Sequence, residues 1–159
     1  MPDIMNPLDA IDRRLLGILQ EDATVPVAEL AQRVGLSQTP CWKRLKRLQD
    51  SGVITGRVAL VDRDALDLSL VVFVAVKTGR HDDAWLETFG KGASALPEVV
   101  EFYRMSGEVD YLLKVVVRDI AAYDRFYKRL IATAPLTDVS SSFAMEQIKF
   151  TTALPIRTS

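Results

Sequence analysis

Apolar residues recur every three or four positions over the first sixty residues, the spacing of helices with one buried face. A second such stretch, PVAELAQRVG at residues 26–35, opens with a proline suited to a first helical turn and closes with a glycine suited to a left-handed cap. A third covers residues 38–50, with Ser37 placed to cap it. Three helices with a glycine-containing turn before the last predict a helix-turn-helix. In the first of the three predicted helices, the apolar face consists of Leu8, Ile11, Leu15, Ile18 and Leu19.

The stretch after this predicted motif alternates between apolar and polar residues. VITGRVALVD, residues 53–62, follows Gly52 and places its alternation around Gly56 and Arg57. Alternation with period two is typical of a strand that is buried on one side. We therefore expect a short hairpin or strand here, which makes the motif a winged helix-turn-helix.

The second half of the chain changes to the period of strands, beginning with the valine-rich SLVVFVAVK. We expect one helix over 82–96 and another that Asp119 caps and Pro135 ends. The order βαββαβ predicts a ferredoxin-like domain and an α+β fold class. The expected strands cover residues 69–77, 98–105, 110–117 and 139–152. The expected organisation is a winged helix-turn-helix domain at 1–61, a polar linker at 62–68 and the ferredoxin-like domain at 69–159.

Composition narrows the classes of function. The net charge is −1, yet residues 37–60 hold five basic residues and one acid, a local net of 5 − 1 = +4. The longest apolar run, residues 70–76, is far shorter than the roughly 20 residues of a membrane helix. One cysteine and one histidine make a zinc site improbable, and no phosphate-binding glycine motif occurs. These features disfavour an enzyme and leave a basic patch to explain.

The basic patch lies on the predicted helix at 38–50. At about 100° per residue, Cys41, Leu45 and Leu48 share the core face, while Arg44 and Trp42 fall at its margins. Lysines and arginines fill the opposite side with no acid expected four residues away, so DNA contact is favoured over an ordinary solvated face. We interpret Cys41 as a packing residue rather than a redox switch, and Trp42 as a packing residue rather than a base-stacking platform. The predicted DNA contacts are Ser37, Gln38, Thr39, Lys43, Arg44, Lys46 and Arg47.

Three segments resemble the Lrp/AsnC family of transcription regulators, in the order of that family. They are LDAIDRRLLGILQED, VGLSQTPCWKRLKRLQDSGVITG and SGEVDYLLKVVV. TPCWKRLKRL together with SSFAMEQIKFTTALPI is similar to one subgroup, the DecR-like regulators of cysteine breakdown. The resemblance implies an N-terminal domain that binds double-stranded DNA and a C-terminal RAM-type domain that senses an amino acid, with L-cysteine as one candidate effector.

The resemblance also implies an assembly and a site. Two chains would pair through their sheets, and dimers would build tetramers or octamers in the cytoplasm, associated with the nucleoid. The effector would lie between dimers, and neither a metal nor another cofactor is expected. The implied effector residues are Arg104, Met105, Ser106, Gly107, Val109 and Asp110, with Phe143, Ala144 and Met145 nearby.

The chemistry of this loop suits an amino acid but leaves alternatives open. Asp110 can accept a hydrogen bond from an ammonium, and backbone N–H groups around Gly107 can donate to a carboxylate. The same residue types are common in plain hairpins, where Asp110 would only fix the turn. Arg104 favours an acidic or polar effector over leucine, or it pairs with Glu108. A further alternative for the whole protein is an architectural DNA-binding protein that senses nothing.

Overall fold

The computed structural model describes residues 7–80 and 82–157, and the chain forms two compact units. The first unit holds residues up to Leu60 together with the segment from Lys149 onward, and the second is Val61–Ile148. The C-terminal segment thus differs from the expected boundary of 69–159. The Gln20 carboxamide explains the difference, because it donates to the Leu154 carbonyl (3.1 Å) and accepts from the Leu154 N–H (2.7 Å).

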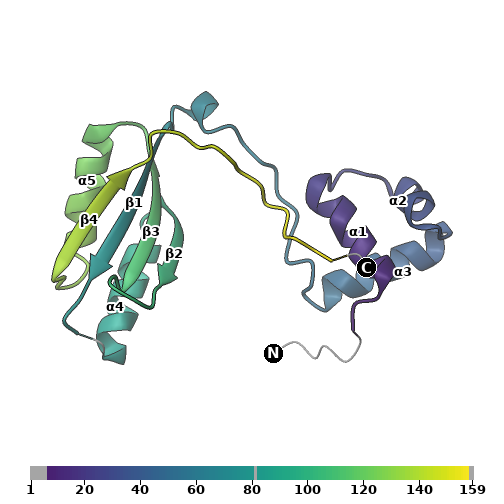
Figure 1. Cartoon of the computed structure of the whole chain (residues 1–159), viewed down its shortest axis with the longest axis horizontal. Helices are drawn as coiled ribbons and strands as arrows, with labels where there is room; N and C mark the ends of the chain where they lie inside the picture. The colour runs from purple at the N-terminus through teal and green to yellow at the C-terminus, as the bar shows by residue number, and fades with distance from the viewer. Residues whose placement is uncertain (1–6, 81, 158–159) are drawn as a thin grey trace. The chain divides into compact units, whose positions relative to one another are not determined.

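The first unit is a three-helix motif of α1 (Ala10–Glu21), α2 (Val27–Val34) and α3 (Gln38–Asp50), shown in Figure 1. A capping box formed by Asp9 and Asp12 begins α1. Gly35 ends α2 at φ +74°, a left-handed conformation that favours glycine. The helix-turn-helix prediction is confirmed. The buried core of this unit is Leu15, Leu30, Ala31, Val34, Cys41 and Leu45.

The predicted wing is wrong, because residues 53–62 form neither a helix nor a strand. The apolar residues that suggested it stay in solvent, with Val58 82% and Leu60 65% exposed. A strand needs a neighbour to accept its backbone hydrogen bonds. All four strands of the described chain lie in the second unit, so residues 53–60 have no such neighbour in the first unit.

The second unit has the expected ferredoxin-like order. A 3-10 turn (Asp64–Leu66) precedes a four-stranded antiparallel sheet in the order β2-β3-β1-β4. The last strand stops at Phe143 instead of residue 152, because its register with β1 ends at Val72 and the Ala144 N–H makes the final bond to Val71. The elements are β1 (Leu70–Lys77), α4 (Asp83–Ser94), β2 (Val99–Arg104), β3 (Tyr111–Val117), α5 (Ile120–Ile131) and β4 (Asp138–Phe143).

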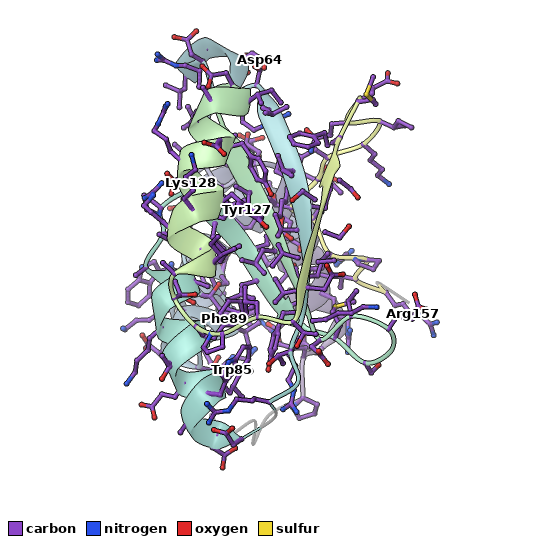
Figure 2. All side chains as sticks on the ribbon, turned by 90° about the vertical axis from the view of Figure 1, so that its left-hand side faces the viewer. Asp64, Trp85, Phe89, Tyr127, Lys128 and Arg157 are labelled. Carbon is purple, nitrogen blue, oxygen red and sulfur yellow. The ribbon has the colours of Figure 1, made fainter. Side chains whose placement is uncertain are left out.

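Both helices cover the same face of this sheet, as Figure 2 shows. Phe89 of α4 and Phe126 of α5 are fully buried against alternating strand residues such as Leu113. The opposite face is open, with Phe73 40% and Tyr103 51% exposed. No helix in the described part of the chain has the length and apolar character needed to cross a membrane.

Candidate DNA-binding helix and effector loop

The third helix is set in place by its apolar face. Cys41, Leu45 and Leu48 are buried, as the sequence predicts. Burial raises the pKa of the Cys41 thiol, which agrees with its interpretation as a packing residue. Pro40 lies in the first turn, where no backbone N–H is required. Ser37 occupies the N-cap position, but its side chain makes no capping hydrogen bond, so the expected cap is missing.

The basic side chains of α3 are not all unpaired, contrary to the sequence interpretation. Lys46 pairs with Asp50 four residues later, with Nζ 3.0 Å from Oδ2, and both side chains are more than half exposed. Such an exposed pair contributes little stability and opens easily. Lys43 is exposed and makes no ion pair with any residue in the described part of the chain. Lys43 and Lys46 are therefore the cations that α3 presents most freely.

The two arginines of α3 instead reach back to acids at the start of α1. Arg44 Nη1 lies 2.9 Å from Oδ1 of Asp12 and also pairs with Asp9. Arg47 pairs with the other oxygen of Asp12, whose side chain is fully buried. The N–H of Asp12 and the Arg44 guanidinium hold the pKa of the Asp9 carboxyl below its ordinary value, and the two acids raise the pKa of Arg44. This charge network fixes α3 against α1.

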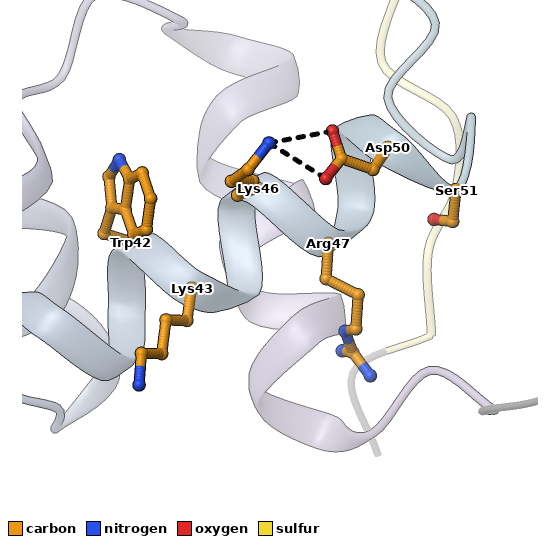
Figure 3. A pocket seen from close by; sticks show the side chains of 6 residues that line it. All are labelled: Trp42, Lys43, Lys46, Arg47, Asp50 and Ser51. Carbon is orange, nitrogen blue, oxygen red and sulfur yellow. Dashed lines mark hydrogen bonds and ion pairs between the residues drawn. The ribbon is translucent and has the colours of Figure 1, made fainter.

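A shallow, open hollow of about 490 Å³ lies on the exposed side of α3 (Figure 3). Trp42 lies at its margin and is 53% exposed, so the prediction that it is a packing residue is wrong. Ser37, Gln38 and Thr39 are also exposed at the beginning of the helix. The lining residues are Trp42, Lys43, Lys46, Arg47, Asp50 and Ser51.

Asp110 fixes the loop between β2 and β3. Its carbonyl accepts from the Met105 N–H at 2.8 Å, and its carboxylate accepts from the Thr78 N–H at 2.8 Å. Gly107 has φ +128°, which favours glycine in this turn. Arg104, Met105, Ser106 and Gly107 are exposed, while Val109 and Asp110 are half-buried. Asp110 therefore fixes the turn of the hairpin, which is one of the two roles considered for it. Arg104 makes no ion pair with Glu108.

The other implied effector residues lie elsewhere in the same chain. The Asp110 N–H bonds to Val76 at one end of β1, whereas Phe143 pairs with Val72, four residues away. At about 3.3 Å per residue this is about 13 Å along the strand. The edge of the Phe143 ring packs on Tyr123, with centroids 5.2 Å apart, and Met145 is almost fully exposed. Within one chain, Phe143, Ala144 and Met145 are therefore not beside the β2–β3 loop.

Sequence reasoning missed the buried carboxylate of Asp12. Asp12 lies four residues after Leu8 and three before Leu15, on the same helix face as these apolar residues. That spacing was the available signal, because a charge inside an apolar stripe requires a partner when the stripe is buried.

Comparison with known proteins identifies the class to which this arrangement belongs. Residues 8–49 match the AsnC-type helix-turn-helix domain, and residues 71–154 match the Lrp/AsnC ligand binding domain. The chain belongs to the Lrp/AsnC family.

Individual members of the family match over nearly the whole chain. The DNA-binding transcriptional activator DecR of Escherichia coli K12 is 53% identical over 150 residues, which cover 94% of this chain and 99% of DecR. The crystal structure of an AsnC family transcriptional regulator from Agrobacterium tumefaciens is 58% identical, with a TM-score of 0.90 over 92% of this chain and 96% of that one. A transcriptional regulator from Neisseria meningitidis, solved as a complex with L-Met, is 36% identical, with a TM-score of 0.88 over 94% of this chain and 97% of that one.

Proposed function

We propose that this protein is a transcription regulator that binds double-stranded DNA through α3 and whose oligomer responds to a small amino acid. The observation that carries the proposal is the exposed basic hollow on the last helix of a helix-turn-helix, where Lys43 has no acidic partner within the described residues. In such motifs the last helix enters the major groove. The alternative is an architectural protein that binds DNA without an effector.

The predicted DNA contacts divide into groups with different roles. Lys43 and Lys46 neutralise phosphates, because they are exposed and free or weakly paired. Arg44 and Arg47 contribute less, since Asp12 already neutralises part of their charge. Short polar side chains at the helix start can reach base edges or phosphates. These are Ser37, Gln38 and Thr39.

The proposed effector is a free amino acid, with L-cysteine first among the candidates. The Neisseria relative bound to L-Met supports an amino acid of some kind. The Asp110 carboxylate would accept from the ammonium, and the N–H groups around Gly107 would donate to the carboxylate. Because the end of β4 is about 13 Å from this loop along β1, a site that uses both segments needs residues from more than one chain.

The open face of the sheet is the proposed surface for pairing two chains. It presents Phe73 and Tyr103, together with Lys114, whose Nζ lies 2.7 Å from Oε1 of Glu101. Covering such a half-apolar face with its own copy is a common way to form a symmetric dimer. Dimers would assemble further into tetramers or octamers. We propose that this assembly works in the cytoplasm on the nucleoid, is not an enzyme and needs no metal or other cofactor.

The test is fluorescence anisotropy on duplex DNA from immediately upstream of the protein's own gene, at two salt concentrations. The titrations are repeated with unrelated competitor DNA and with a panel of free amino acids that includes cysteine and methionine. Specific, salt-sensitive binding that one amino acid shifts is expected. Binding that ignores the whole panel supports the architectural alternative. Absence of binding to several promoters contradicts the proposal.

Two variants locate the two sites. Lys43→Ala should weaken binding to all sequences and reduce the salt slope by about 0.9. Lys128→Ala is the matched control, since it removes an exposed helical lysine from α5. Asp110→Asn keeps an acceptor for Thr78 but removes the charge, so it should blunt the effector response and leave DNA affinity nearly unchanged. A normal response in Asp110→Asn removes Asp110 from the effector site.

A further inference from the structure

The third helix carries a large aromatic side chain that its domain does not use for packing. Trp42 is 53% exposed, whereas its neighbour Cys41 is completely buried. The other tryptophan of the chain behaves differently. Trp85 is 3% exposed, and its Nε1–H donates to the Pro135 carbonyl at 3.0 Å. The indole of Trp42 therefore has both a free apolar surface and, among the described residues, an Nε1–H without an acceptor.

The surroundings of Trp42 select an anionic partner. It shares the hollow on α3 with Lys43, Lys46 and Arg47, and the one acid there, Asp50, is paired with Lys46 (Figure 3). Asp50 offsets Lys46 and Asp12 offsets Arg47, so Lys43 leaves this surface with a net positive charge and a positive potential. An apolar segment of another protein would not need these charges. The charges match a polyanion that also offers apolar contacts.

Duplex DNA offers both chemistries within the width of one groove. The deoxyribose rings and the C5-methyl group of thymine are apolar, and the flanking phosphates accept hydrogen bonds. Trp42 is the fifth residue of α3, in the half of such a helix that contacts base edges. The bases of duplex DNA remain stacked on one another, so the indole of Trp42 meets base edges and methyl groups rather than base faces.

We propose that Trp42 is a DNA-contacting residue that packs its indole on a thymine methyl group in the major groove. It thereby adds sequence preference to the phosphate contacts of Lys43 and Lys46. This inference rests on the proposed DNA binding by α3. It assigns a role to a side chain that the sequence analysis placed at the margin of the core face and interpreted as a packing residue.

The two tryptophans provide the first test. Trp85→Phe leaves Trp42 as the sole indole of the chain, and Trp42→Phe leaves only Trp85. Both are titrated with fluorescently labelled duplex DNA, so that anisotropy reports binding independently of indole emission. We expect DNA to quench and blue-shift the emission of Trp42 and to leave that of Trp85 unchanged. Unchanged Trp42 emission on DNA that anisotropy shows to be saturated overturns the inference and leaves the proposed function standing. No anisotropy change contradicts the proposed function itself.

Replacing thymine by deoxyuridine in the bound duplex tests the methyl contact. Removal of one buried methyl should weaken binding of the unsubstituted protein by about fourfold. Trp42→Ala should bind the two duplexes equally, because the partner of the methyl is gone. An equal loss in both proteins overturns the methyl contact. An altered oligomeric state of Trp42→Ala in sedimentation, with unchanged DNA affinity, assigns the indole to a protein interface and also overturns the inference.

Discussion

The N-terminal three-helix unit and the C-terminal sheet unit bury different kinds of side chain. The core of the first is a small aliphatic cluster that adjoins one fully buried carboxylate, Asp12, paired with two arginines of α3. The core of the second contains four aromatic rings in mutual contact, those of Trp85, Phe89, Phe102 and Tyr111. A small unit buries a smaller fraction of its surface and gains less from apolar area. The helix proposed to bind DNA is therefore held by a charge network in addition to its apolar face, whereas the sheet unit is held by hydrophobic packing.

The largest expected effect comes from opening the aromatic core. Phe89 is fully buried, with its ring centroid 5.0 Å from that of Trp85 and 5.5 Å from that of Tyr111. Phe89→Ala should lower the free energy of unfolding of the C-terminal unit by about 3–5 kcal/mol, because it leaves a cavity as well as losing apolar contact. Chemical denaturation followed by the emission of Trp85 measures this. Ile120→Ala, at a 62% exposed position of α5 in the same unit, is the control, and similar losses in both variants would contradict the packing described.

In the N-terminal unit, the corresponding loss of stability is expected from a change at the buried carboxylate of Asp12. Asp12→Asn leaves Arg44 and Arg47 without their shared partner, although both guanidinium groups can regain water, with side chains 28% and 37% exposed. We expect a loss of about 2 kcal/mol, less than for a fully buried pair. The chain has one cysteine, Cys41, which is buried in this unit and reports its opening. Its labelling by a thiol reagent should become about thirtyfold faster.

Asp50→Asn is the control for Asp12→Asn. It removes the exposed partner of Lys46 and should change the labelling rate of Cys41 very little. If Asp12→Asn also leaves that rate unchanged, the arginines do not pair with a buried carboxylate in solution, and the contrast between the two units disappears.

The same contrast explains what the sequence could predict. The sheet unit follows local rules, since β1 alternates between valines buried under the helices and residues of the open face, and Asp119 caps α5 where expected. The order of elements and the core face of α3 were predictable for this reason. The charge network was not, because it joins residues more than thirty positions apart. The missing wing, the exposed Trp42 and the tail contact at Leu154 also depend on partners that are distant in the sequence or absent.

A smaller effect on the free energy of unfolding is expected from the N-cap residues, because the side chain of one caps its helix and that of the other does not. The Asp119 carboxylate accepts from the Ala122 N–H at 2.7 Å at the start of α5, whereas Ser37 makes no such bond at the start of α3. Asp119→Ala should therefore lower the free energy of unfolding of the C-terminal unit by about 1 kcal/mol. Ser37→Ala should change that of the N-terminal unit by less than about 0.5 kcal/mol. Equal losses in urea denaturation would mean that Ser37 caps α3 in solution.

The smallest expected effect tests to which unit the C-terminal segment belongs. Gln20 holds Leu154 through two reciprocal hydrogen bonds, and the Leu154 side chain is 72% exposed, so these bonds rather than packing keep the segment on α1. Gln20→Ala should make hydrogen exchange at the Leu154 amide several-fold faster, while the stability of both units stays within about 0.5 kcal/mol. Gln32→Ala, at an exposed position of α2, is the matched control and should leave Leu154 unchanged. Equal exchange at Leu154 in the unsubstituted protein and both variants would show that Gln20 does not hold the segment on the N-terminal unit. The residues from 149 onward would then be assigned to the C-terminal unit.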